Sequence, residues 1–374
     1  MPIAVSHTRQ SFTVDGRRIW IVAGSLSYAR IDPADRPARL ADLRQAGCNA
    51  VEVPVPWLLH EPRPGRFDFE GMADLPGFLR EAQAAGLHVI LRAGPYIGDG
   101  HDGGGLPAWL GEIEPPPPPS RPTVKSMQGP KQRISRTASE VFLNRVALWF
   151  KALFEQVVPL QITTDGPILL MQIEHRWLCD HHEAAEAYLG ELVRMARESG
   201  VDVPLLNAND LWTDDFGTID TWQGNTDLLA NLRQLRTLRE DVPRVVSRYE
   251  VAAMPLAEQP RPAAVDPDTA LYGLASILAA GAQPVIAPFH GGVHFGALGG
   301  REPGPDGGTA TFAAAVAAPI GEAGDRGPLY HRLRRLANFA TSFGHVFADL
   351  DPDFHSTVQV PPMPGADTGS GAVR

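Results

Sequence analysis

Two arginines stand at the ends of apolar segments, at positions where side chains commonly do chemistry. In "LLMQIEHRWL" the apolar residues give way to Glu174, His175 and Arg176, and "PRVVSRYE" carries Arg248 and Glu250. A guanidinium stays protonated and donates hydrogen bonds in a planar fork that fits a carboxylate or a phosphate. Two guanidiniums held close together repel, so we expect them to meet either an anionic ligand or acidic side chains of the protein.

Histidines and carboxylates gather on neighbouring segments and could transfer protons. "GPYIGDGHDGGG" contributes Asp99, His101 and Asp102, and "FHGGVHFG" contributes His294. Imidazole titrates near neutral pH, and a carboxylate accepts a proton where its surroundings raise its pKa. We predict that His175 and Asp99 act together with the two arginines as the catalytic residues.

A wider set of side chains is expected to contact the substrate. Aromatic rings offer an apolar face and a polar tip, although as a group they more often belong to a protein core. The predicted substrate-binding residues are Glu174, His101, Asp102, Glu250, Tyr96, Trp57, Tyr28, Trp222 and His294.

A metal site is an alternative use of the same groups. Asp99, His101 and Asp102 lie within four residues, and His175 belongs to a neighbouring segment. Histidine and carboxylate sets bind zinc and other divalent ions, but two nearby arginines oppose a cation, so we predict no metal and no cofactor. "CDHH" at 179–182 is a weaker candidate, in which Asp180 is better explained as a helix N-cap.

The segments that carry these residues follow one repeated order. A helical run ends at a glycine and a short apolar strand follows at once, as in "LADLRQAGCNAVEVPV", "FLREAQAAGLHVILRAG", "LVRMARESGVDVPLLNA" and "LASILAAGAQPVIAPF". The glycines (47, 86, 200 and 281) suit the left-handed conformation that ends a helix. Asp32 and Pro33 mark the start of the first helix. Helices that alternate with strands predict a parallel sheet.

Eight strands are expected, at 19–28, 50–57, 88–97, 167–176, 203–209, 218–224, 244–250 and 284–290. Eight such units favour a closed α/β fold, the (β/α)8 TIM barrel, over an open sheet. The G-x-G-x-x-G motif of dinucleotide-binding folds does not open a helix after the first strand. In a TIM barrel the active site lies at the carboxyl ends of the strands, where the arginines and histidines are expected to meet.

Two segments lie outside this pattern. Residues 111–137 combine five consecutive prolines with charged side chains, which predicts either a lid over the strand ends or a flexible spacer. Residues 351–374 are predicted to form a partly disordered C-terminal tail. The remainder, 1–350, is expected to be a single barrel domain.

The composition limits the classes of partner that we expect for this chain. The 374 residues carry a net charge of −10 without a basic stripe, so nucleic acid is not an expected partner. No apolar run approaches the ~18–20 residues that span a bilayer, and we expect no signal peptide before the first strand. With only Cys48 and Cys179, a disulfide framework is excluded and a cytoplasmic location is expected. The expected partner is an anionic small molecule; the oligomeric state stays open.

Several segments together resemble the family 35 glycoside hydrolases, the β-galactosidases. The resemblance rests on "VEVPVPWLLHEP", "HVILRAGPYIGDGHDGGGLPAWL", "GPILLMQIEHRW", "PRVVSRYE", "PFHGGVHFG" and "APIGEAG", and it runs over most of residues 10–345. It implies that family's catalytic TIM barrel. The β-domains that the family usually appends to the barrel are not expected in this chain.

The resemblance also implies two catalytic glutamates that this chain lacks. The family ends its fourth strand with Glu-Asn-Glu, whose last Glu is the general acid/base, and its seventh with a nucleophilic Glu. Arg176 and Arg248 occupy these positions. Retaining glycosidases need two carboxyl groups, and arginine can neither attack the sugar nor exchange a proton with it. We therefore predict that the chain is not a retaining β-galactosidase.

Residues that the resemblance assigns to sugar binding differ as well. Pro54 and Ala287 replace tyrosines, and Gly98, Asp99 and Gly100 replace Cys-Ala-Glu, so galactose is not the expected ligand. The leading hypothesis is an enzyme that acts on an anionic or charge-developing small molecule by elimination, isomerisation or cyclisation, as in specialised metabolism. Two alternatives stay open: a ligand-binding protein without turnover, and a glycosidase for a sugar acid.

Overall fold

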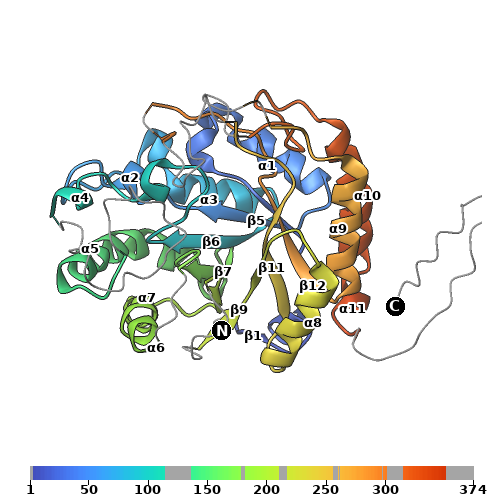
Figure 1. Ribbon diagram of the computed structural model, residues 1–374, viewed down its shortest axis with the longest axis horizontal. Helices are drawn as coiled ribbons and strands as arrows, with labels where there is room; N and C mark the ends of the chain where they lie inside the picture. Colours follow the sequence, from blue (N-terminus) through green and yellow to red (C-terminus); the bar gives the residue numbers. More distant parts are fainter. Residues whose placement is uncertain are drawn as a thin grey trace, which may run out of the picture.

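A parallel β-sheet surrounded by helices forms the centre of the molecule (Figure 1). The computed structural model describes residues 3–113, 136–177, 182–209, 217–255, 260, 262–296, 298–300 and 315–350. The central strands are β4 (Ala23–Ser25), β5 (Ala50–Pro54), β6 (His88–Gly94), β7 (Ile168–Ile173), β8 (Leu205–Asn207), β9 (Thr218–Asp220), β10 (Trp222–Gln223), β11 (Arg244–Glu250) and β12 (Ala282–Ala287). Their order in the sheet is β10-β11-β12-β4-β5-β6-β7-β8-β9, and all neighbours are parallel.

The sheet closes on itself at a single residue. β9 and β10 lie at opposite ends of the strand order, yet only Thr221 separates them in the chain. The Thr221 amide donates to Asn207 O on β8 at 2.9 Å, and its hydroxyl contacts Ser247 Oγ on β11 at 2.7 Å. β9 and β10 are therefore one strand position, and the predicted eight-stranded α/β barrel is confirmed.

The outer layer consists of helices that follow the strands. The longer ones are α1 (Arg36–Gln45), α3 (Leu75–Ala84), α5 (Glu140–Val157), α7 (Glu191–Glu198), α8 (Leu228–Leu238), α9 (Pro267–Ala279) and α10 (Pro328–Ser342), with short helices α2 (Trp57–His60), α4 (Leu110–Ile113), α6 (His182–Ala185) and α11 (Gly344–Phe347). The predicted turn glycines 47, 86, 200 and 281 all have positive φ, as a helix-to-strand turn requires. Asp32 accepts a hydrogen bond from Ala34 N and caps the 3-10 turn Pro33–Asp35, which leads directly into α1.

The first predicted strand, 19–28, is wrong at its start. A separate antiparallel sheet of β1 (Val5–His7), β2 (Phe12–Val14) and β3 (Arg17–Ile19) takes the residues up to 19, and the barrel strand is only Ala23–Ser25. Asp15 and Gly16, with φ of 49° and 74°, form the tight turn between β2 and β3. An Asp-Gly pair between two short strands is a hairpin signal, and it was present in the sequence.

Some predicted features lie outside the described residues. Of the predicted lid loop 111–137, residues 114–135 are not described, and the predicted tail 351–374 is not described either. Within the ranges given above, no helix combines the length and the apolar character that crossing a bilayer would require.

Candidate active-site pocket

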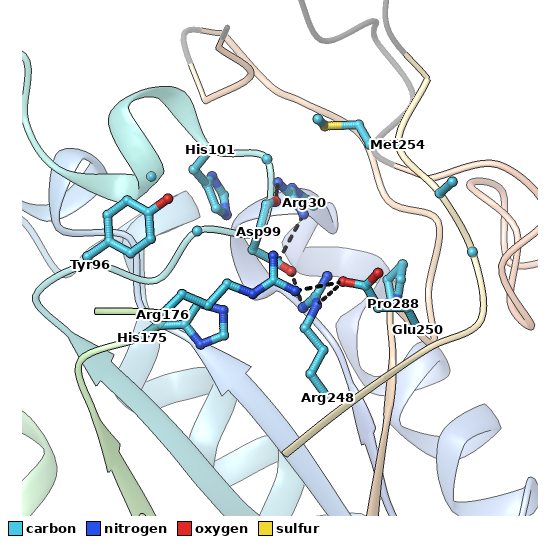
Figure 2. A pocket seen from close by; sticks show the side chains of 15 residues that line it. Arg30, Tyr96, Asp99, His101, His175, Arg176, Arg248, Glu250, Met254 and Pro288 are labelled. Carbon is cyan, nitrogen blue, oxygen red and sulfur yellow. Dashed lines mark hydrogen bonds and ion pairs between the residues drawn. The ribbon is translucent and has the colours of Figure 1, made fainter. Parts of the chain in front are cut away.

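A pocket of about 260 Å³ opens at the carboxyl ends of the barrel strands (Figure 2). All four predicted catalytic residues line it, together with three predicted binding residues, Tyr96, His101 and Glu250. The full lining is Arg30, Tyr96, Gly98, Asp99, Gly100, His101, Gly104, His175, Arg176, Arg248, Glu250, Ala252, Ala253, Met254 and Pro288. Among these residues three guanidiniums face two carboxylates, so the lining carries one excess positive charge. Its size suits a ligand smaller than most drug-like molecules.

Arg248, on β11, is held from two sides. Its Nη1 donates to Asp99 Oδ1 at 2.7 Å and its Nε to Glu250 Oε1 at 2.9 Å, and only 11% of the side chain is exposed. Burial alone would lower the pKa of the guanidinium, but the two carboxylates outweigh it and raise that pKa further. The internal pairing considered for this arginine is therefore present.

Asp99 joins two arginines to the loop that follows β6. Besides Arg248, Arg30 approaches Asp99 Oδ2 at 3.2 Å and also contacts the Asp99 carbonyl oxygen. Burial would raise the pKa of this carboxyl, but Arg248 and Arg30 outweigh it and hold the pKa far below its usual range. A carboxylate of that kind is a poor proton acceptor, so the geometry favours a charge-pairing role for Asp99 over the predicted proton transfer.

Arg176 is held more loosely than Arg248. Its Nε donates to Gln223 Oε1 at 3.2 Å, its Nη2 lies 3.4 Å from Glu250 Oε1, and 49% of the side chain is exposed. The residue has φ of 49°, a left-handed conformation that a non-glycine residue adopts at a cost of ~1–2 kcal/mol. The guanidinium can therefore reach a ligand without leaving a buried site.

His175 is fixed in one tautomer by Gln172. The Gln172 amide nitrogen donates to Glu174 O at 2.9 Å and lies 3.1 Å from His175 Nδ1, so Nδ1 accepts and Nε2 carries the proton. Burial, followed by the charges of Arg92 and Arg248, lowers the pKa of His175 well below its ordinary value. His175 is thus a neutral donor, in the way that a neutral imidazole polarises a carbonyl in some barrel enzymes.

His101 and His294 are neighbouring imidazoles. Their ring centroids are 6.4 Å apart and the ring planes are perpendicular, and the ring nitrogens of His294 have no hydrogen-bond partner within the described part of the chain. Burial, with the charge of Arg30, lowers the pKa of His101 well below its ordinary value and that of His294 to about 4. His101 lines the pocket as a neutral ring, and its lowered pKa makes it a weak base there.

Arg136, which sequence reasoning missed, holds the end of β7 from behind. It is ion-paired with Glu174, donates to His175 O at 2.9 Å and to Arg176 O at 3.3 Å, and lies 3.9 Å from the centre of the Tyr96 ring. Tyr188 donates to the second Glu174 oxygen at 3.0 Å. This arrangement fixes the backbone that presents His175 and Arg176. Its only sequence signal was its place near the end of the predicted lid loop 111–137.

Six predicted binding residues do not line the pocket, and three of them have partners in the core instead. Glu174 faces Arg136 and is fully buried, and Tyr28 contacts His60 in the core. Trp57 stacks on Trp149 at 5.8 Å and donates to Glu61 at 2.6 Å. Asp102 is exposed and Trp222 is half-buried, and neither lines the pocket, nor does His294. The core alternative weighed for the aromatic residues thus holds for Tyr28 and Trp57.

The metal alternative finds no support in this geometry. Within the described ranges, no three His, Cys, Asp or Glu side chains are grouped so that they could hold an ion. Cys179, Asp180 and His181 of the "CDHH" candidate lie outside those ranges.

Comparison with known proteins gives matches to one family of glycosyl hydrolases. The family model described as glycosyl hydrolases family 35 matches residues 11–340. The Beta-galactosidase-1-like protein of Mus musculus is 32% identical over 344 residues, which cover 89% of this chain and 50% of that protein. Beta-galactosidase 17 of Arabidopsis thaliana is 36% identical over 59% of this chain and 29% of its own length. The chain thus spans about half or less of these relatives.

Solved structures share the fold at low identity. A β-galactosidase from the psychrophilic Marinomonas ef1 superposes with a TM-score of 0.60 at 12% identity, over 88% of this chain and 62% of that one. A glycoside hydrolase family 5 mannosidase from Rhizomucor miehei gives a TM-score of 0.59 at 12% identity, over 93% of this chain and 99% of that one. At this identity the likeness concerns the barrel alone.

Proposed function

The chain belongs to glycosyl hydrolase family 35, and from that premise we propose that its pocket binds a small anionic molecule instead of carrying out retaining hydrolysis of a β-galactoside. The half-exposed guanidinium of Arg176, in a lining with one excess positive charge, carries this proposal. Retaining hydrolysis needs a carboxyl nucleophile and a carboxyl acid/base, and Arg248 and Arg176 stand where the resemblance expects them.

The proposal extends to a reaction in which negative charge develops on the substrate. Arg176 and the Nε2–H of His175 are donors on one wall of the pocket, and such fixed donors stabilise an oxyanion or enolate. We assign proton transfer to the neutral ring of His101, which acts as a weak base because its pKa is lowered. Elimination, isomerisation and cyclisation all use this set of roles.

A glycosidase that recruits other carboxylates is less well supported. Glu174 is buried behind the pocket on Arg136, and Glu250 is engaged by both arginines, with a pKa that these cations hold below its ordinary value despite burial. Burial raises the pKa of Glu174, so the two carboxyls have the opposite shifts that an acid and a nucleophile need, but Glu174 does not line the pocket and cannot act there on a ligand together with Glu250. A binding protein without turnover shares the pocket chemistry and differs only in the absence of a product.

Thermal shift with inorganic phosphate, malonate and glucuronate tests the proposal. At about 100 times its Kd a bound anion stabilises the fold by ~2.7 kcal/mol, and Arg176→Ala should abolish the stabilisation. Arg194→Ala is the matched control, because Arg194 on α7 is similarly exposed (53%) and also meets carboxylates. If no anion stabilises the protein, or if both variants lose the effect equally, the proposal is wrong.

Mass spectrometry of the stabilising anion after incubation with the protein separates enzyme from binder. A change of mass or of isomer that requires His101 supports catalysis. An unchanged ligand assigns the pocket to binding alone.

A further inference from the structure

We propose that the Glu250 carboxylate occupies the place of the ligand's anionic oxygen, so that a ligand binds by displacing it. This inference rests on the proposed function of the pocket and adds the residue that competes with the ligand. The ligand's anionic group is a carboxylate or a phosphate, which share the oxygen chemistry that a guanidinium recognises.

One oxygen of Glu250 bridges the two arginines. Oε1 accepts from Arg248 Nε at 2.9 Å and lies 3.4 Å from Arg176 Nη2, while these arginines come from different strand ends (Figure 2). The protein thus places an anionic oxygen of its own between the two guanidiniums. A ligand oxygen at the same point would meet the same donors.

Glu250 is able to leave, whereas the other acidic partner is not. Its side chain is 44% exposed, against 5% for Asp99. The Glu250 backbone stays fixed, because its N–H donates to Asn225 Oδ1 at 2.9 Å and its carbonyl accepts from the Asn225 amide. Displacement therefore needs only a rotation of the side chain into solvent.

Displacement breaks two contacts of Glu250, one with Arg248 and one with Arg176, and the contact with Arg176 is weak. The distance of 3.4 Å to the half-exposed Arg176 is long for a charge-assisted hydrogen bond, and exposed ion pairs contribute little to stability. Arg248 keeps Asp99 at 2.7 Å when Glu250 moves, so no buried charge loses all its partners. Arg176 is the group that gains, since it exchanges a distant carboxylate for the ligand.

Isothermal titration calorimetry with phosphate and with glucuronate tests displacement in the full chain. Glu250→Gln keeps the shape and removes the competing charge, and it should bind the anion about fivefold more tightly, the factor that ~1 kcal/mol represents. Asp102→Asn is the matched control, because it removes one negative charge from an exposed residue of the neighbouring loop that does not line the pocket. We expect it to change the affinity less than twofold. Whichever probe gains affinity identifies the anion class.

The outcomes separate this inference from the proposed function. Tighter binding by Glu250→Gln alone supports displacement, also where the unchanged protein binds too weakly to measure. If Glu250→Gln weakens binding while the unchanged protein binds, Glu250 positions the arginines and displacement is wrong, although the pocket still binds anions. An equal gain in Asp102→Asn reduces the effect to general electrostatics and also overturns displacement. If no protein binds either anion, the proposed function itself fails.

Discussion

The two strand ends that carry the arginines differ in how they hold them. At the end of β11, Arg248 is nearly buried and meets Asp99 and Glu250 at 2.7 and 2.9 Å. At the end of β7, Arg176 is half-exposed, and its distances to side-chain oxygens are 3.2 and 3.4 Å. Arg248 is thus a buried arginine with two carboxylate partners, whereas Arg176 is an accessible arginine with weaker contacts.

This difference teaches that the neighbours of an arginine, and not its type, decide what it can bind. Arg248 is held by Glu250 of its own strand and by Asp99 of the loop after β6, whereas the Glu174 carboxylate after β7 turns away to Arg136 and leaves Arg176 facing the pocket. The fixed backbone behind Arg176 is what makes an exposed side chain useful for recognition. Substitutions at four residues break or sharpen this comparison.

The largest loss of stability is expected when Asp99, the carboxylate that holds Arg248, is removed. Asp99→Ala leaves the nearly buried guanidiniums of Arg248 and Arg30 without their shared carboxylate, and we expect a loss of about 3–5 kcal/mol of unfolding free energy. Urea denaturation followed by circular dichroism measures it. A loss below 1 kcal/mol would show that Arg248 is not anchored by Asp99.

The next largest loss of stability is expected at Arg136, which fixes the backbone turn that presents Arg176. Arg136→Ala leaves the buried Glu174 without its cation and frees the turn at residues 174–176, with an expected loss of about 3 kcal/mol. Arg136→Lys should recover only part of it, because an ammonium cannot serve several acceptors in one plane. Anion binding should fall in both variants. Full recovery by lysine would mean that charge alone suffices.

A smaller effect is expected in the pH dependence of stability, in which His175 and Asp99 should differ. The folded-state pKa of His175 lies well below that of an unfolded histidine, ~6.5, so its contribution is complete above that pH and is lost as the pH falls below it. Asp99, with a depressed pKa, loses its contribution only below ~4. His175→Gln should therefore flatten the decline of stability between pH 6 and 5 by ~1 kcal/mol per pH unit, and Asp99→Asn should not. Equal slopes in all three proteins would contradict this.

The smallest effect on stability is expected at Arg176. Arg176→Ala removes a half-exposed contact, and the expected change in unfolding free energy is below ~1 kcal/mol. The same variant should abolish anion binding, so stability and recognition separate at this residue. A destabilisation as large as that of Asp99→Ala would make Arg176 a second anchor.

The barrel and the location of the four predicted catalytic residues could be read from the sequence, because helix-to-strand turns at glycine and strand-end polar residues are local patterns. The pairings could not be read in this way, since Arg248 and Asp99 are 149 residues apart in the chain. Tyr28 and Trp57 lie in segments that approach the strand ends, but packing against His60 and Trp149 directs them into the core. Arg136 stands outside any periodic segment.

Release of nitrophenol from nitrophenyl β-galactoside by the purified protein is the most direct measurement. With guanidiniums at both strand ends, no release above that in buffer is expected. Turnover at ordinary enzymatic rates, about 1–10³ per second, would contradict the account, because it would require two working carboxyl groups in a place where the structure has Arg176 and Arg248.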